Sequence, residues 1–360
     1  MKYQNIIMML FALAFITACN EDKVFEREQY KHVIAIKSDG VYKIFNQEVD
    51  LSNVDADGFA NGFIAADVGG SLPTGQAIKL SIVEDPVILD QYNQYNFATV
   101  TYKYANYIPD DRKIISDYSI SIPAGERSGI MNIRVRPGGL SPDSAYMIPF
   151  RVSNVSAYEM NQDESTVLYN LQWKNQWTST ANIAKYSHKG VTAQWGSVGT
   201  VPNDGPDTEV NTLAQKDVYP LSVNQVRIFA ADHIFTSDVL AIKEWGLILT
   251  VDEAGNVKIS NVDDNVGPKV VQIDHQCGGG HADWKCQICE PEAYADPTDL
   301  RAKGSCHYDP HYNNTYAVVT DQWKRQYKTF LLCYSYTSPD DGKIRVMKEE
   351  LKIDYVPDFK

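Results

Sequence analysis

The sequence predicts an all-β protein built from two domains, and three observations lead to this prediction. Short apolar or alternating segments recur along the chain, separated by turns that contain Gly and Pro. Tyrosine, which is enriched in strands, occurs 22 times against 12 phenylalanines. The 360 residues also exceed the usual size of one domain, which is roughly 150 residues.

The start of the sequence has the layout of an export signal. Lys2 precedes an apolar run over residues 6–16, which is too short to span a bilayer as a mature helix. Small residues then lead to Cys19, at the place where ordinary signals end in A-x-A-like residues. This ending resembles a bacterial lipobox, in which cleavage precedes the cysteine and that cysteine carries lipid. We therefore predict a lipoprotein signal peptide at 1–18 and a lipidated tether at 19–30, with a plain secretory signal as the alternative.

The first domain is predicted over residues 31–175. The stretch 90–93 is less strand-like and is expected to be a short helix or loop, and Pro149 indicates an edge or a bulge for its strand. Short strands at regular spacing with Gly/Pro turns predict an immunoglobulin-like β-sandwich. The strand segments are 32–36, 41–45, 58–66, 77–83, 118–121, 130–135 and 146–152.

Four short motifs in this region recur in a fixed order: 90–93 (DQYN), 108–109 (IP), 122–126 (IPAGE) and 146–150 (YMIPF). In this order they resemble the N-terminal domain of unknown function in surface lipoproteins of the Bacteroidota. Such proteins are often encoded beside SusC/SusD-type glycan-uptake systems, in the place of the SusE-like lipoproteins. The resemblance implies a lipid-anchored protein exposed on the outer membrane, and the acidic pair after Cys19 agrees with it.

The second domain is predicted over residues 181–360, after a polar boundary segment at 173–180. Trp173 and Trp177 in that segment are expected to pack at the domain interface. The pattern predicts a second β-sandwich or a barrel-like domain. Its strand segments are 191–195, 218–229, 245–251, 257–260, 329–336 and 343–351.

A long Cys/His-rich loop is predicted at 275–312, inside this second domain. One Cys-x-x-Cys pair with further Cys and His residues is typical of a zinc site, whereas an exported chain also permits disulfides. Of the three possible states of the loop cysteines, we expect disulfides first, a bound metal second and unpaired thiols third. Cys333 lies outside the loop and is expected to be a buried core thiol. The candidate disulfide or metal residues are Cys277, Cys286, Cys289, Cys306, His281 and His307.

The same loop is rich in aromatic residues. Aromatic faces can stack on the apolar faces of sugar rings, and long loops without strands are often functional. The alternative is that these side chains pack the loop onto the sheet. The candidate ligand-binding residues are Trp284, Tyr294, Tyr308 and Tyr312.

Composition and motifs narrow the class of function. The net charge of −13 disfavours a nucleic-acid partner, because binding phosphates requires clustered Lys and Arg. No metalloprotease, nucleophile-elbow or phosphate-loop motif occurs. We therefore predict a non-catalytic glycan-binding lipoprotein that needs no cofactor, zinc being the one candidate, with a membrane and SusC/SusD-type proteins as partners. A protein-binding or adhesive lipoprotein with a stapled loop, and a glycoside hydrolase with unrecognised carboxylates, are the alternatives.

Overall fold

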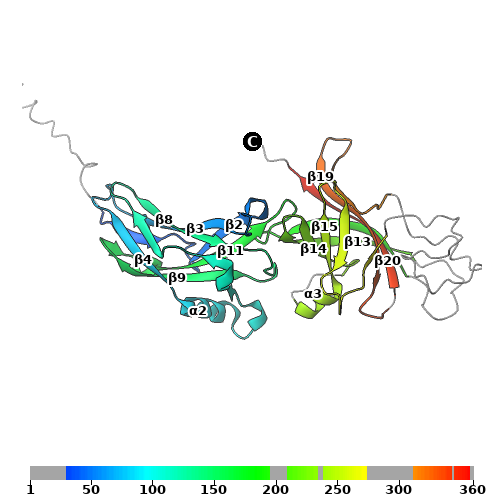
Figure 1. Ribbon diagram of the computed structural model, residues 1–360, viewed down its shortest axis with the longest axis horizontal. Helices are drawn as coiled ribbons and strands as arrows, with labels where there is room; N and C mark the ends of the chain where they lie inside the picture. Colours follow the sequence, from blue (N-terminus) through cyan, green and yellow to red (C-terminus); the bar gives the residue numbers. More distant parts are fainter. Residues whose placement is uncertain (1–29, 195–208, 234–237, 274–310, 343, 357–360) are drawn as a thin grey trace, which may run out of the picture.

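The computed structural model of this protein describes residues 30–194, 209–233, 238–273, 311–342 and 344–356. Figure 1 shows two bodies of β-structure side by side along the long axis of the molecule. The described residues form mainly strands, with two α-helices, α2 (Pro86–Phe97) and α3 (Val239–Trp245). The predicted all-β class is therefore confirmed. No helix in the described part is both long and apolar enough to cross a membrane.

The N-terminal body is a sandwich of two sheets. Alternate residues of each sheet point inward, as the two-residue period of a strand requires, and they enclose a core that includes Ile64, Phe150 and Tyr169. One sheet has the order β10 (Glu159–Met160), β1 (Val33–Ile36), β3 (Ala60–Val68), β8 (Ser128–Val135), β6 (Lys113–Ile114). The other has the order β2 (Ile44–Asp50), β11 (Thr166–Lys174), β9 (Tyr146–Val155), β4 (Ile78–Glu84), β7 (Ser119–Ile122), with β5 (Asn106–Tyr107) paired to β9.

Helix α2 covers part of the outer face of the second sheet. Met147 on β9 and Leu168 on β11 point away from the main core and are nevertheless buried, because Leu89 of α2 and Ala105 pack on them. This second, smaller core explains the continuous apolar run in β9, which is buried on both faces at this point. The segment that was expected to be a short helix or loop is therefore a helix of three turns, docked on the sheet.

Pro149 lies in a central strand, although the sequence indicated an edge or a bulge. Strand β9 pairs with β11 on one side and with β4 on the other, and the pairing with β4 stops at Phe150. The carbonyl of Pro149 accepts from the backbone N–H of Asp85, just beyond the end of β4. Because N–H and C=O of one strand residue point to the same side, the missing N–H of Pro149 falls where no strand needs it.

The C-terminal body is one strongly curved, barrel-like sheet that wraps around its own core. The segment 218–229, predicted as one strand, is two, because residues Val223 and Asn224 form a two-residue hairpin turn. The sheet order is β16 (Val257–Asn261), β15 (Gly246–Val251), β14 (Gln225–Phe229), β13 (Glu209–Ser222), β12 (Ala184–Gln194), β20 (Ile344–Tyr355), β19 (Gln326–Thr337), β17 (Val271–Gln272), with β18 (Thr315–Thr320) also paired to β19.

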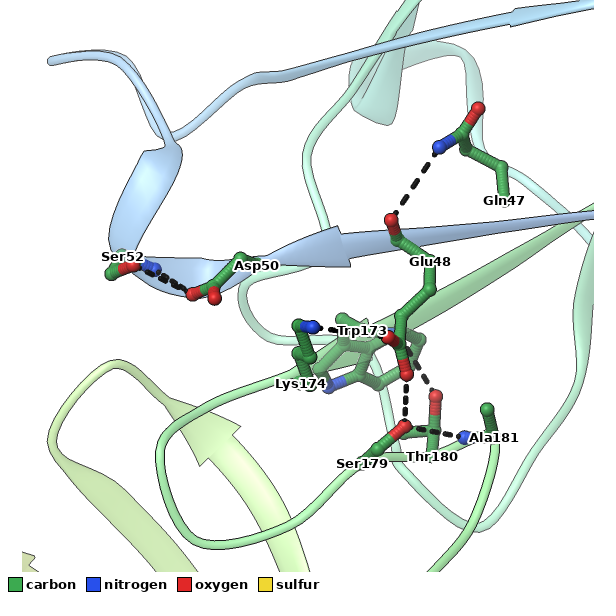
Figure 2. Close-up of polar contacts among 9 residues, drawn as sticks. All are labelled: Gln47, Glu48, Asp50, Ser52, Trp173, Lys174, Ser179, Thr180 and Ala181. Atoms are coloured by element: carbon green, nitrogen blue, oxygen red, sulfur yellow. Dashed lines mark hydrogen bonds and ion pairs between the residues drawn. The ribbon is translucent and has the colours of Figure 1, made fainter. Parts of the chain in front are cut away.

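Polar contacts fix the short connection between the two bodies. Trp173 packs in the N-terminal core, and its indole N–H donates to the carbonyl of Pro220 in the C-terminal body at 3.1 Å. Trp177 packs in the C-terminal core. Figure 2 shows Ser179 of the connection donating to Glu48 at the end of β2, with Lys174 3.4 Å from the same carboxylate.

A buried ion pair adds a second link between the bodies. Asp143, in the segment between β8 and β9, receives two hydrogen bonds from the guanidinium of Arg227 on β14. Both side chains are less than a tenth exposed. A bidentate Arg–carboxylate pair fixes orientation as well as distance, so it holds the two bodies in one relative arrangement.

Candidate ligand-binding surfaces

Most of the predicted loop lies outside the described residues. The loop residues outside the described part include the candidate ligand-binding residues Trp284, Tyr294 and Tyr308, and the disulfide or metal candidates Cys277, Cys286, Cys289, Cys306, His281 and His307. Cys19, the predicted lipidation site, also lies outside the described residues. These assignments stay predictions. Among the described residues, no group of three or more His, Cys, Asp or Glu side chains could hold a metal ion.

The two ends of the predicted loop meet at Asn314. Its side chain donates to the carbonyls of Ile273 and Cys333 at 2.9 and 3.1 Å, and it accepts from the N–H of Cys333 at 2.8 Å. Asn314 is buried, and so is Cys333, as expected for a core cysteine. Tyr312, the remaining ligand-binding candidate, is half-buried, with its ring edge-on to His311 at 4.8 Å.

A surface pocket, called the hollow below, lies beside α2 on the N-terminal body. Asp85 caps the helix by accepting from the N–H of Val87, and Pro86 occupies the first turn, where no N–H is needed. Asn93 then ties the following loop to the helix through two hydrogen bonds with the peptide groups of Ala105, of 3.0 and 2.8 Å. The hollow has a volume of about 600 Å³ and is lined by Pro86, Leu89, Asp90, Asn93, Thr101, Tyr104, Ala105, Asn106 and Tyr107.

Aromatic rings gather on α2 and the segments next to it, and one of them, Tyr104, lines the hollow. The side chains of Tyr95 and Tyr102 are 82% and 71% exposed, and Tyr42, from the turn before β2, is 44% exposed. Several of these rings contact one another. The ring centre of Tyr42 lies 6.2 Å from that of Tyr92 and 6.5 Å from that of Tyr95. The ring centre of Phe97 lies 6.0 Å from that of Tyr92 and 6.4 Å from that of Tyr104. We call the hollow, these five residues and the exposed Tyr102 together the α2 surface: Tyr42, Tyr92, Tyr95, Phe97, Tyr102 and Tyr104.

The polar groups of the α2 surface are suited to binding hydroxyl groups. Burial raises the pKa of the Tyr92 phenol, and Tyr42 and Asp39 add to the shift, so this hydroxyl stays a hydrogen-bond donor. Asp90 and Asn106 are exposed beside the hollow and can accept or donate. A shallow site with apolar rings and a few polar groups can bind a polar molecule that has apolar faces.

The sequence assigned no binding role to these tyrosines. Tyr92 belongs to the motif at 90–93 that carries the family resemblance, and the other rings are scattered between residues 42 and 104. The close spacing of tyrosines between 92 and 107 is the signal that could have found them.

A buried cluster of charges lies inside the C-terminal sheet, away from any exposed surface. Glu349 on β20 binds Lys216 of β13 and lies 2.9 Å from the ring nitrogen Nε2 of His188 on β12. All three side chains are at most 3% exposed, and the Tyr334 hydroxyl donates to the same carboxylate at 2.8 Å. Burial opposes ionisation of Glu349, but Lys216 and His188 outweigh it and hold the pKa of this carboxyl below its usual value.

The pKa shifts of the described carboxyl groups can be compared with the shift that a glycoside hydrolase requires. Each resolved shift is downward, whereas the general acid of a glycoside hydrolase needs a raised pKa. Hydrogen bonds or cationic neighbours lower these values against the effect of burial. The groups are Asp50, Asp55, Asp252, Asp263, Asp321 and Glu349.

Two family models match this chain. One is described as an N-terminal domain and matches residues 30–159, and the other is described as a C-terminal domain and matches residues 165–352. The C-terminal model alone spans more than half of the chain. The chain belongs to this two-domain family. Among proteins with curated functions, none matches the chain.

Solved structures share the fold of this family over almost the whole chain. A Bacteroides ovatus protein of unknown function has a TM-score of 0.59 at 13% identity and covers 91% of this chain and 97% of its own. A multidomain protein of the same organism has a TM-score of 0.55 at 13% identity, with coverages of 91% and 95%. An auxiliary nutrient binding protein from Bacteroides thetaiotaomicron has a TM-score of 0.55 at 13% identity, with coverages of 88% and 93%. The likeness establishes a shared fold, and the organisms agree with the group that the sequence motifs resemble.

Proposed function

We propose that this protein is a non-catalytic surface lipoprotein that binds glycan for a Sus-like uptake system, using the α2 surface. The observation that carries the proposal is the set of exposed tyrosines on and next to α2, a helix that also borders a hollow and is tied to the following loop by Asn93. A tyrosine ring offers an apolar face to the C–H groups of a sugar and a hydroxyl to its oxygens. Because contacts between rings already join Tyr42, Tyr92, Tyr95, Phe97 and Tyr104, these side chains lose little entropy when a ligand binds.

Three further points support the proposal. The lipobox-like segment ending at Cys19 suits attachment to a membrane. The fixed junction between the two bodies suits a molecule that holds its C-terminal body at a set distance from the anchored N-terminal body. A structural neighbour of the same fold is an auxiliary nutrient binding protein.

Retention on arrayed glycans tests the binding role. We expect Tyr95→Ala and Tyr102→Ala each to weaken glycan binding by about tenfold, the effect of losing one stacking contact. Tyr30→Ala is the matched control, because Tyr30 is 71% exposed, as is Tyr102, but lies outside the α2 surface. Equal retention of all four proteins would contradict the use of this surface, and retention of no glycan by the wild type would contradict the function.

A protein-binding role is the second candidate, and one observation favours it. Val41 is 78% exposed next to Tyr42, and Val87 is 57% exposed on the first turn of α2. Apolar side chains beside aromatic rings are also typical of protein interfaces. Val41→Asp and Val87→Asp should abolish binding to a protein partner, whereas they should leave glycan retention unchanged if the tyrosines bind sugar.

The loop 275–312 is proposed as a second ligand contact, through Trp284, Tyr294, Tyr308 and Tyr312. Intact-mass measurement under native and denaturing non-reducing conditions distinguishes the states of its cysteines. Each disulfide lowers the mass by about two units, a bound zinc is released on unfolding, and free thiols do neither.

Lipid attachment and outer-membrane exposure are part of the same proposal. We expect Cys19→Ser to abolish incorporation of labelled fatty acid and to release the protein from the membrane fraction. Protease added to intact cells should degrade the wild-type protein if it faces outward. Co-purification of SusC/SusD-type proteins with the wild type would support the assignment to an uptake system.

A further inference from the structure

The tip of the β18–β19 hairpin carries a second aromatic surface, on the other body of the molecule. Its turn spans residues 321–325 and presents Trp323, whose side chain is 67% exposed. In Figure 1, β19 and the hairpin lie on the opposite side of the view from α2. This surface is therefore separate from the α2 surface.

The backbone of the turn that carries Trp323 is fixed by Asp321. Asp321 accepts hydrogen bonds from the backbone N–H groups of Trp323 and Arg325, both at 2.9 Å. Its second oxygen accepts from the guanidinium of Arg325 at 2.8 Å and from the hydroxyl of Tyr327 at 3.2 Å. One carboxylate thus orders the whole turn, and an ordered turn loses little entropy on binding.

Cations alternate with rings along this surface. The guanidinium of Arg325 lies 5.0 Å from the ring centre of Trp323 and 5.7 Å from that of Tyr327. The ammonium of Lys352 on β20 lies 4.0 Å from the centre of the Tyr327 ring. These contacts are within the range of cation–π attraction, and they leave the indole supported from one side and largely exposed to solvent.

The local charge is positive although the chain carries −13. Lys324, Arg325 and Lys352 contribute three positive charges, and Asp321 and Asp354 contribute two negative ones. Asp321 is neutralised by Arg325, whose pKa it raises through a hydrogen bond. By contrast, the hollow of the α2 surface is lined by Asp90 and by no cation.

We propose that the hairpin surface formed by Trp323, Lys324, Arg325, Tyr327 and Lys352 binds acidic carbohydrate, meaning sugar units that carry carboxylate or sulfate. A sugar ring stacks on the free face of the indole, and its anionic group lies against Lys324 and the Arg325 guanidinium. Charge complementarity selects this ligand over a neutral glycan. The inference rests on the proposed function only in taking a carbohydrate as the ligand, and it uses a different surface.

Binding measured at low and at 0.5 M salt tests the assignment with four probes: oligogalacturonate, a sulfated heparin-type oligosaccharide, maltohexaose, and phosphatidylglycerol vesicles. We expect the wild type to bind one or both acidic oligosaccharides, and binding to weaken with salt because the pairing is exposed. Trp323→Ala and Lys324→Glu should each weaken it by about tenfold. Gln322→Ala, in the same turn, and Tyr30→Ala, outside both surfaces, should leave it unchanged.

Oligogalacturonate carries carboxylates and the heparin-type oligosaccharide carries sulfates, so comparing their binding shows which anionic group the hairpin surface prefers. Binding of vesicles alone would overturn the proposal, as would acidic-glycan binding that survives Trp323→Ala. If maltohexaose binds through Tyr95 while no acidic glycan binds, the hairpin proposal fails and the proposed function stands. If acidic glycan binds through Trp323 while Tyr95→Ala and Tyr102→Ala change no binding, the hairpin proposal stands and the role of the α2 surface fails.

Discussion

Asn93 and Ala105 exchange two hydrogen bonds, in which the side-chain amide of one residue matches the peptide group of the other. Both residues are buried, and they join α2 to the loop that closes the hollow beside it. No hydrogen bond of the helix itself depends on this contact. The contact therefore holds the loop that carries Tyr102 and Tyr104 against the helix.

We expect Asn93→Leu to destabilise the protein by about 1–3 kcal/mol, because the peptide group of Ala105 would be left buried without its partners. The loop should also detach, so binding at the α2 surface should weaken more than stability alone explains. Urea unfolding measures the first effect and titration with a retained glycan the second. Gln94→Leu, at the exposed neighbouring position, is the control, and an equal effect of both variants would contradict this account.

Gly190 on β12 pairs with Glu349 of strand β20, which leaves no room for a side chain at this position. A Cβ at this position would lie 2.5 Å from the carbonyl oxygen of Lys348 and 2.4 Å from the terminal methyl group of Met347. The side chain of Met347 can move, but the backbone cannot, so Gly190→Ala should cost about 1–3 kcal/mol of stability. Gly138→Ala is the matched control, since a Cβ there meets nothing within 4 Å. Thermal unfolding of the two variants checks this, and equal midpoints would show that β20 can shift.

The ion pair between Asp143 and Arg227 links the two bodies. Removing one partner leaves a charge buried, so Arg227→Met should destabilise the contact between the bodies by about 3–5 kcal/mol. Calorimetry should then show two separate unfolding transitions, or a wider separation than in the wild type. The double variant Asp143→Leu/Arg227→Met should recover part of the loss, because neither charge remains. No recovery would indicate that shape, and not charge, dominates this contact.

Stability should fall in acid because of Glu349. Its pKa is below the usual value in the folded protein, so its ionised form stabilises the fold above the unfolded pKa of about 4.3. That contribution is lost as pH falls through the lower, folded pKa. Glu349→Gln should lower stability at neutral pH, because Lys216 loses its counter-charge, and should flatten the decline of stability below about pH 5. Urea midpoints across this range measure it, with Glu350→Gln as control. An unchanged acid slope would refute the assignment.

Local sequence determined the class of structure. Alternation in segments such as 77–83 predicted strands and their inward faces, and Ile78, Leu80 and Ile82 are all buried. This works because a strand repeats every two residues, so burial of one face leaves a pattern in a few consecutive residues. The predicted site residues outside the described part, such as Trp284 and Cys286, stay predictions.

Tertiary structure decided where strands break, which strands become neighbours and which side chains converge. Only the paired strands reveal that Pro149 occupies a gap inside a sheet. Likewise, Tyr42 and Tyr95 belong to one surface because the docking of α2 brings them together. Lys216 and Glu349 are 133 residues apart and meet inside one sheet. Such contacts depend on long-range pairing, which a period of two or 3.6 residues does not encode.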